Sequence, residues 1–400
     1  MTDAALERIG QRSLVRDFVA GRSFMGRPYL VSPLVDFLLA GGGALLALGF
    51  FLIFYPLQGG RGVSQQDLAL VAGLFATLSY VVNYPHFMAS YGLLYGNLNE
   101  RLAADNPRSI FWWRIVTAAY GVPIALILYF AYAISQKSQQ LFGFAIHAMF
   151  FFVGWHYLKQ SYGVFAVLSG MKGIFYKPWQ VIALKSHVYS LWLYTWYISG
   201  AVMITGSPAQ PTTFTSITYP PLDLYKTQPL VEFLYWPVVA CAVAGWGAIV
   251  WNAIETRRLP SFTALIGYTS MYTLLAFVRI HPLFAYGGPM FHSLQYMLFV
   301  YAYKRGEFHH AGLDAHGAES AGSSKPYWLK MLGYFSIICA TGALAFDVLP
   351  VYFDTKTPRW GMAMVAMPIF HVFINVHHYF IDSVIWRRGN KDVTRNLFAR

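Results

Sequence analysis

The sequence has 400 residues, of which 56% are hydrophobic and 12% are charged. Because about a quarter of the residues of a soluble domain are charged, this composition excludes a soluble globular protein and indicates an integral membrane protein. A formal net charge of +12 would favour nucleic acid binding in a soluble protein, but here the basic residues gather in short loops and near both ends. That distribution is typical of membrane orientation, so we expect the lipid bilayer and no nucleic acid as partner.

Ten apolar segments, each long enough to form a helix across a bilayer, predict an all-α, polytopic membrane protein. A basic arm at residues 1–31 precedes the transmembrane domain at residues 32–387, and a basic tail follows at residues 388–400. No cleaved signal peptide is evident. The ten segments are residues 32–57, 66–97, 111–135, 140–168, 181–205, 229–254, 261–279, 283–304, 327–350 and 361–387.

The basic residues provide a test of this segment count. The arm, the tail and the four loops on their side, counted with the adjoining ends of the apolar segments, hold 22 Lys and Arg residues. The loops and segment ends on the opposite side hold six, and Lys159 lies inside a segment. An excess of Lys and Arg marks the cytoplasmic side. We therefore expect about ten spans, with both termini in the cytoplasm and the bacterial inner membrane as the location.

The tenth segment carries an unusual set of polar residues. In FHVFINVHHYFIDSVIWRR, residues 370–388, a helix places His371, Asn375, His378 and Asp382 on one face and His377 roughly a quarter turn away. Polar side chains at this depth are costly and seldom face lipid. This face is therefore expected to line a metal site, a ligand cavity or a proton path.

Three other segments bring a histidine to a similar depth. One lies in NYPHFMAS, one in FFVGWHYLKQSYG and one in HPLFAYGGPMFHSLQY. Burying so many imidazoles without strong ligands would cost roughly several kcal/mol, which favours a metal centre. The predicted metal ligands are His86, His156, His292, His377 and His378.

The remaining histidines have simpler explanations. His147 and His187 are expected to be packing or interfacial residues, and His281, which precedes Pro282, caps a helix end or lines an entrance. His371 lies on the polar face of the tenth segment, and no role of its own is assigned to it. A Gly/Ala/Ser-rich segment, residues 306–324, predicts a mobile loop with three solvated histidines, His309, His310 and His316.

The ligand types limit which metal such a centre would hold. Neutral imidazole suits iron, copper, zinc and nickel, and scarce intramembrane carboxylates argue against magnesium and calcium. Cys241 and Cys339 lie in apolar runs and indicate neither a disulfide framework nor a thiolate site. Haem remains possible, but its iron would need only two axial histidines, whereas about five imidazoles are available here.

The polar residues beside the predicted ligands suggest supporting roles. Asp382 is expected to accept the second N–H of a ligating ring and, with Asn375, to orient the ligands. Lys159 or Tyr296 would handle protons.

Two of the histidine segments resemble a known family. HPLFAYGGPMFHSLQY is similar to the His-Pro and His-Ser segments of the Brp/Blh membrane beta-carotene 15,15'-dioxygenases, and NYPHFMAS is similar to their early Pro-His segment. The resemblance covers about thirty residues. It implies a multi-helix membrane enzyme in which His86, His281 and His292 take part in holding non-haem iron.

A membrane oxidoreductase therefore accounts best for the sequence. It would use histidine-bound non-haem iron, Fe²⁺, and dioxygen to act on a lipid or an isoprenoid or carotenoid-like substrate taken from the bilayer.

Two alternatives remain open. The pair His377–His378 followed by Asp382 also resembles di-iron desaturases and hydroxylases, although no H-x3-H box is present. A proton-coupled transporter is the other alternative, in which His156, Lys159, His371 and Asp382 would form a relay and the broken segment HPLFAYGGP a discontinuous helix.

The topology can be tested directly. Reporter fusions at Arg400 and within residues 211–222 are expected to report opposite sides of the membrane, because an even number of spans separates the arm from the tail and the Pro/Thr-rich loop lies on the outer side. Two fusions that report the same side would contradict the predicted topology.

Overall fold

The structure of this chain is a bundle of long helices. The computed structural model describes residues 29–54, 70, 73–74, 76–104, 106–107, 109–198, 212–214, 217–219, 227–280, 287–316, 327–356, 365–387 and 390–397. Helices occupy all ten predicted apolar segments within these ranges, which confirms the all-α fold class. In chain order the elements are α2 Pro33–Phe37, η1 Leu38–Gly42, α3 Gly43–Phe54, η2 Ser79–Asn83, α5 Tyr84–Tyr95, α6 Leu98–Ala104, α7 Ile110–Val116, η3 Thr117–Gly121, α8 Val122–Ser135, α9 Gln139–Met171, α10 Pro178–Ile198, β1 Thr212–Phe214, β2 Ile217–Tyr219, α11 Gln228–Thr256, α12 Phe262–Ile280, α13 Gly287–His316, α14 Tyr327–Ala343, η5 Leu344–Val348, α15 Leu349–Lys356, α16 Ala366–Ile385 and α17 Lys391–Leu397.

Several helices are long and apolar enough to cross a membrane. Among the residues that the structure describes, five meet this criterion by length and composition, which indicates membrane association. Helix α16 is not among them, because its histidines, Asn375 and Asp382 interrupt an otherwise apolar run. The five spans are Pro33–Phe50, Ile110–Ser135, Gln139–Met171, Gln228–Thr256 and Tyr327–Lys356.

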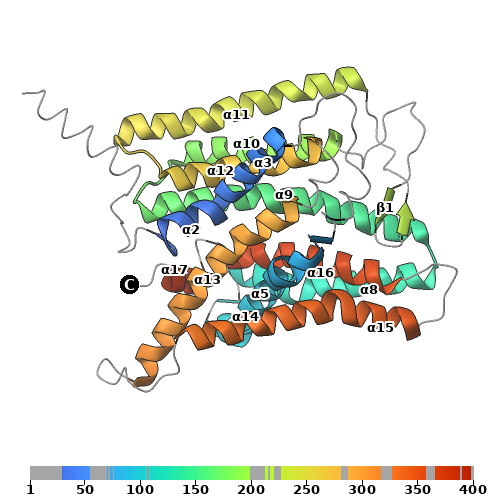
Figure 1. Cartoon of the computed structure of the whole chain (residues 1–400). Coiled ribbons are helices and arrows are strands. Elements are labelled where there is room, and N and C mark those ends of the chain that lie inside the picture. Colours follow the sequence, from blue (N-terminus) through green and yellow to red (C-terminus); the bar gives the residue numbers. More distant parts are fainter. Residues whose placement is uncertain are drawn as a thin grey trace, which may run out of the picture.

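The long helices run roughly side by side (Figure 1). Helices α10, α11 and α12 lie on one side of α9, and α8, α16 and the α14–α15 run lie on the other, while α13 crosses the bundle obliquely. Helix α16 packs against α5, α8 and α9, and α13 packs against η1, η2 and α5. Helices α5, α9, α13 and α16 therefore surround the middle of the bundle.

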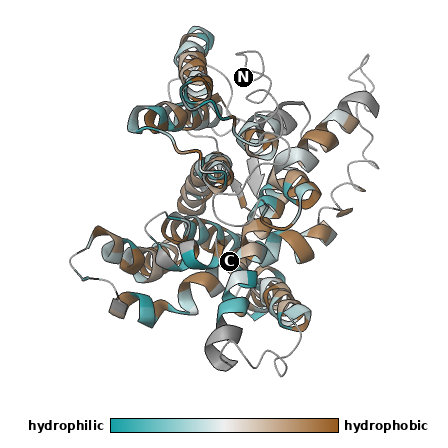
Figure 2. Cartoon of the chain, turned by 90° about the vertical axis from the view of Figure 1, so that its left-hand side faces the viewer, coloured by the Kyte–Doolittle hydropathy of each residue, from teal (hydrophilic) through white to brown (hydrophobic). Residues whose placement is uncertain are grey.

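The outer surface of the bundle is apolar. Seen along the helices, hydrophobic residues lie on the outward faces as well as inside (Figure 2). On α11 the large side chains of Phe233, Trp236 and Ile254 are 68%, 67% and 71% exposed. Surfaces of this kind are unfavourable in water and suit contact with lipid.

Within the described part of the chain, four π-helical turns lie where polar side chains of the bundle gather. These turns are η1, η2, η3 and η5. A π-bulge interrupts the regular helical hydrogen-bond ladder and is frequent at functional sites. Here Asn83 of η2 presents its carbonyl oxygen to His86, and Ala40 of η1 presents its own to Gln295. The bulges thus supply acceptors for polar side chains in an apolar interior.

The structure corrects one expectation and leaves others outside its described residues. The predicted mobile loop that begins at residue 306 is helical as far as His316, because α13 continues through His309 and His310. The tail contains α17, which packs against α13. Residues 1–28 and His281 lie outside the described residues. Of the outer connection before α11, the structure describes a small antiparallel hairpin, in which Thr212 pairs with Tyr219 and Phe214 with Ile217.

Gly41 allows η1 and α12 to approach closely. Its φ of 144° is rarely adopted by other residues. A Cβ atom there would lie 2.8 Å from Cβ of Ser270 and 3.0 Å from the carbonyl oxygen of Ile266. This contact places α12 beside the bulge whose Ala40 carbonyl accepts from Gln295.

Replacement of Gly41 by Ala is therefore expected to destabilise the fold by about 1–3 kcal/mol, through backbone strain and the clash with α12. The measurement is thermal unfolding of the purified protein in detergent. Gly49→Ala is the matched control, because a Cβ at Gly49 meets nothing within 4 Å. Equal midpoints for the two variants would contradict the packing described here.

Candidate metal centre

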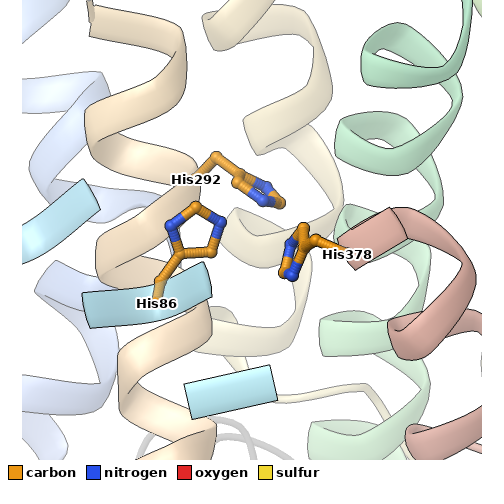
Figure 3. Close-up of side chains that lie close together, drawn as sticks. All are labelled: His86, His292 and His378. Carbon is orange, nitrogen blue, oxygen red and sulfur yellow. The ribbon is translucent and has the colours of Figure 1, made fainter. Parts of the chain in front are cut away.

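Four histidines from four different helices surround one point in the bundle. They are His86 of α5, His156 of α9, His292 of α13 and His378 of α16, and each is at most 5% exposed. The ring centroids are 5.4 Å apart for His86 and His292, 4.7 Å for His292 and His156, 4.8 Å for His156 and His378, and 4.7 Å for His378 and His86. The four imidazoles thus form a closed ring, three of which Figure 3 shows.

The imidazole nitrogens lie at distances that suit a shared metal ion. Nε2 of His156 is 3.1 Å from Nε2 of His378, and one nitrogen each of His86, His292 and His378 lie within 4.8 Å of one another. Two ligands about 2.1 Å from an ion and at right angles to each other lie roughly 3 Å apart. The pair His156–His378 therefore matches two neighbouring ligands of one ion.

Several polar atoms of these residues have no hydrogen-bond partner among the residues that the structure describes. They are both ring nitrogens of His292, Nδ1 of His378 and Oδ2 of Asp382. Buried polar groups are nearly always paired, and each exception calls for a physical explanation. A metal ion bound by a ring nitrogen of His292 and by Oδ2 of Asp382 would offset the free-energy cost of burying these atoms without a partner.

Hydrogen bonds orient His86 toward the ring centre. Its Nδ1 lies 2.5 Å from the carbonyl oxygen of Asn83 in η2 and 2.9 Å from Oγ of Ser293. Because Nδ1 carries the proton that the carbonyl accepts, Nε2 keeps its lone pair for a metal. Such a partner on the second nitrogen is the usual device that fixes a ligating ring.

His292 is held by stacking and by its backbone. The ring of Tyr157 lies parallel to it, with centroids 4.1 Å apart. Gln160 donates to the carbonyl oxygen of His292 and to Oε1 of Gln295, each at 2.9 Å. Gln295 in turn donates to Ala40 at 2.6 Å. This amide network ties α9, α13 and η1 together beside the ring.

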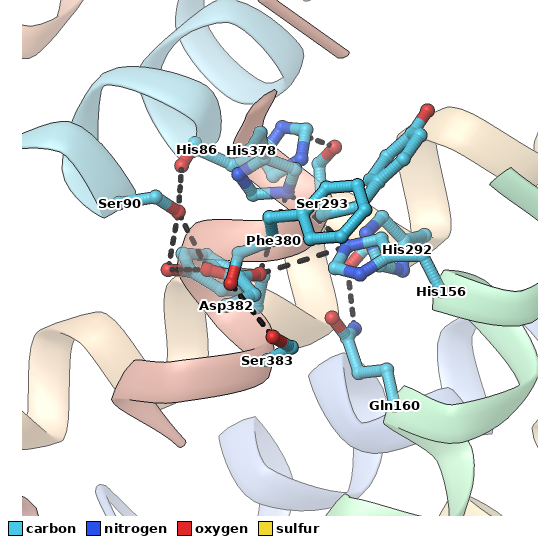
Figure 4. A network of polar contacts seen from close by, with 12 residues as sticks. His86, Ser90, His156, Gln160, His292, Ser293, His378, Phe380, Asp382 and Ser383 are labelled. Carbon is cyan, nitrogen blue, oxygen red and sulfur yellow. Dashed lines mark hydrogen bonds and ion pairs between the residues drawn. The ribbon is translucent and has the colours of Figure 1, made fainter. Parts of the chain in front are cut away.

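Asp382 turns one carboxylate oxygen toward the histidines and anchors the other (Figure 4). Oδ1 accepts from Ser90 at 2.8 Å and from Tyr296 at 2.9 Å. Oδ2 lies 3.4 Å from Nε2 of His378 and 3.6 Å from Nε2 of His156. These separations fit a third ligand of the same ion better than the close hydrogen bond to one ring that the sequence suggested. We call His86, His156, His292, His378 and Asp382 the candidate metal centre.

The structure does not bring His377, also predicted as a metal ligand, into this group. Its Nδ1 lies 2.9 Å from the hydroxyl of Tyr91, and its Nε2 lies 2.9 Å from the carbonyl oxygen of Ala118 in η3. Neighbouring residues on a helix point about 100° apart. His377 therefore faces α5 and η3, and both of its nitrogens are already occupied.

Asn375, which was expected to orient the ligands, and Lys159, which was expected to handle protons, both lie outside the ring of four histidines. Asn375 donates to the carbonyl oxygen of His371 and accepts from Tyr379, whose ring lies 4.8 Å from that of His156. Lys159 places its ammonium 4.4 Å from the ring centroid of Trp155 and is close enough to Asp382 to interact with its charge. Tyr296, by contrast, contacts Asp382 directly.

Two other histidines belong to separate packing contacts. His187 bonds Tyr268 at 2.8 Å through Nδ1 and Tyr272 through Nε2, so it is a satisfied packing residue, as expected. His371 packs against Phe346, with ring centroids 5.0 Å apart.

Sequence reasoning missed the residues that orient the ligands. Ser90 follows His86 by one helical turn, and Ser293 directly follows His292. The spacing of Ser90 was visible in the sequence, but its partner Asp382 lies 292 residues away. No local pattern reveals such a contact.

Comparisons with known proteins give no match: no family model, no curated protein and no solved structure is similar to this chain. Its function is therefore inferred from the sequence and from the candidate metal centre.

The different roles of the two adjacent histidines are testable by metal analysis of purified protein. His378→Ala is expected to lower metal affinity by more than about 100-fold, because it removes a ligand and not an outer partner. His377→Ala is expected to keep the full metal content, since that ring faces Tyr91 and Ala118. A metal-free His377→Ala protein that remains folded would contradict this assignment.

Proposed function

We propose that this chain is an integral membrane oxidoreductase that holds one non-haem iron ion in the candidate metal centre. The observation that carries the proposal is the ring of four buried imidazoles, in which nitrogens of His292 and His378 have no partner among the described residues. Imidazole and carboxylate ligands together are typical of non-haem iron in oxygenases. No thiolate is near, since Cys241 and Cys339 lie elsewhere, on α11 and α14.

One ion fits this arrangement better than two. The two groups of residues able to hold an ion, His86–His292–His378 and His156–His378–Asp382, share His378. Di-iron carboxylate sites in helical bundles draw on about four carboxylates. Among the described residues these groups contain one, Asp382, so we rank a di-iron desaturase or hydroxylase second.

The residues around the ion would divide the remaining work. When bound, iron would supply the redox chemistry with dioxygen. Ser90 and Tyr296 hold Oδ1 of Asp382 and leave Oδ2 turned toward the ring. The Tyr296 hydroxyl, which donates to Oδ1 of Asp382, would supply protons, and Lys159 lies within electrostatic range of the same carboxylate.

We infer a hydrophobic substrate taken from the bilayer, a lipid or an isoprenoid or carotenoid-like molecule. Aromatic rings line the centre on the side of α5 and η5, where Phe87 lies 4.7 Å from His378 and 5.0 Å from Phe346. The resemblance of the histidine segments to Brp/Blh dioxygenases supports an isoprenoid. The same proposal includes about ten spans, cytoplasmic termini and the bacterial inner membrane.

A second candidate function is proton-coupled transport. It is favoured by the direct approach of His156 to His378 at 3.1 Å and of both to Asp382, because such a line of groups can pass a proton. In that case the imidazoles would hydrogen-bond one another and bind no metal.

Elemental analysis separates the two candidates. Protein purified in detergent and loaded anaerobically with Fe²⁺ is expected to contain one iron per chain, because the five ligands surround one point. In liposomes that contain beta-carotene or unsaturated fatty acid, the loaded protein is expected to consume dioxygen in proportion to the product formed. His292→Ala is expected to lose both iron and oxygen uptake.

The matched control is His187→Ala, which removes a buried histidine whose partners are tyrosines. Folded wild-type protein that binds no iron would overturn the proposed function and favour transport. Two irons per chain would favour the di-iron alternative.

A further inference from the structure

Tyr296 links the candidate metal centre to other aromatic rings of the bundle. Its hydroxyl donates to Oδ1 of Asp382 at 2.9 Å and lies 2.6 Å from Oγ of Ser90. The side chain is 2% exposed. Because Oδ2 of the same carboxylate faces the histidines, a single carboxyl group separates the phenol from the ion that the centre would hold.

A column of aromatic side chains continues from Tyr296. Trp386, directly after α16, has its ring centroid 5.6 Å from that of Tyr296. Tyr303, two helical turns after Tyr296 on α13, is 6.3 Å from Trp386 and only 1% exposed. Phe299 lies on the same side of Trp386, at 6.3 Å. The three oxidisable rings are therefore spaced closely enough for electrons to pass between neighbours.

The column ends where the bundle becomes charged. Lys304 follows Tyr303 and pairs with Glu307 at 2.6 Å, and Arg101 pairs with Asp392 of α17 at 2.8 Å. Figure 1 shows α17 and α13 together at the end of the bundle that carries the C-terminus. The rings thus lead from the buried centre toward ion-paired side chains, of which Asp392 is the most exposed, at 41%.

We propose that Tyr296, Trp386 and Tyr303 form an electron-transfer path between the candidate metal centre and this charged end of the bundle. The inference rests on the proposed function, because it needs a redox-active metal ion in the centre. It assigns to Tyr296 a redox role in addition to holding Asp382.

The proposed path moves one electron at a time, and each proton moves between neighbouring groups. With an oxidised metal ion in the centre, Tyr296 would give up one electron to it and would transfer its hydroxyl proton to Oδ1 of Asp382, which already accepts its hydrogen bond. The resulting tyrosyl radical then takes one electron from Trp386 and recovers the proton from Oδ1. Trp386 is restored by one electron from Tyr303, whose phenol proton passes to the carboxylate of Glu307, one helical turn later on α13. An external one-electron donor then restores Tyr303, and Glu307 returns the proton.

A purely structural role for Tyr296 would predict a different outcome. In that case the phenol only positions Asp382, and Trp386 only fills space after α16. Tyr296→Phe would then alter metal affinity without removing any radical, and Trp386→Phe would alter neither.

The experiment uses full-length protein loaded with Fe²⁺, whose iron content is measured first. The loaded protein is mixed with hydrogen peroxide and frozen at intervals for electron paramagnetic resonance. Trp386→Phe is expected to retain iron and to show a tyrosyl radical that persists several-fold longer than in the wild type, because its reductant is missing. Tyr296→Phe and the double variant are expected to lose that tyrosyl signal.

Tyr268→Phe is the matched control, since this buried tyrosine bonds His187 and lies outside the path. Iron-loaded Trp386→Phe and Tyr296→Phe proteins with the wild-type radical yield and decay would overturn this inference alone. Absence of bound iron in folded wild-type protein would overturn the proposed function together with it. If Tyr296→Phe fails to bind iron, the lifetime of the radical in Trp386→Phe decides the question.

Discussion

The structure depends on the high cost of leaving polar groups unpaired in an apolar bundle. An imidazole or a carboxylate surrounded by hydrocarbon must find a partner, and lipid offers none. His86, Asp382 and His377 therefore reach partners on other helices, and these contacts specify how α5, α9, α13 and α16 pack. In membranes, where hydrophobic burial adds little to helix association, such contacts and close packing carry much of the specificity.

The π-bulges solve one part of this problem. A regular helix uses nearly all of its carbonyl oxygens internally, so it has none to offer a buried side chain. In η1 the carbonyl oxygen of Ala40 faces Gln295, and in η2 that of Asn83 faces His86. In η3 the carbonyl oxygen of Ala118 faces His377. Each bulge thus gives a nearby side chain an acceptor without water. Irregular backbone of this kind is tolerated at membrane depth when it is buried in protein.

The fold was largely predictable from the sequence because hydropathy is a local property. The apolar segments marked where helices lie, and the depth argument selected His86, His156, His292 and His378 correctly as neighbours. His377 was grouped with them because two adjacent histidines look alike in sequence, whereas in the structure their rings point in different directions. The helical extension through His309 was missed because Gly, Ala and Ser suggested a loop, yet alanine is the best helix former.

The residues that hold the candidate ligands in place could not be predicted from local sequence patterns. Ser90 and Tyr296 reach Asp382 only after α5, α13 and α16 have packed. Gln160, which resembles an ordinary polar residue of α9, acquires its role from the carbonyl of His292 on another helix. Helix periodicity shows which face a residue occupies, but the rotation of each helix in the bundle depends on all of its neighbours.

The distribution of the ligands along the chain has a consequence for biosynthesis. His86 lies in an early helix and His378 in a late one, and the contact between Ser90 and Asp382 joins residues 292 apart. A nascent chain that has not yet released α16 from the ribosome lacks both His378 and Asp382, so the centre does not exist during most of translation. Early helices enter the bilayer with His86 and His156 unsupported by their final partners. A metal ion held by the candidate metal centre would therefore bind late, after the bundle is complete.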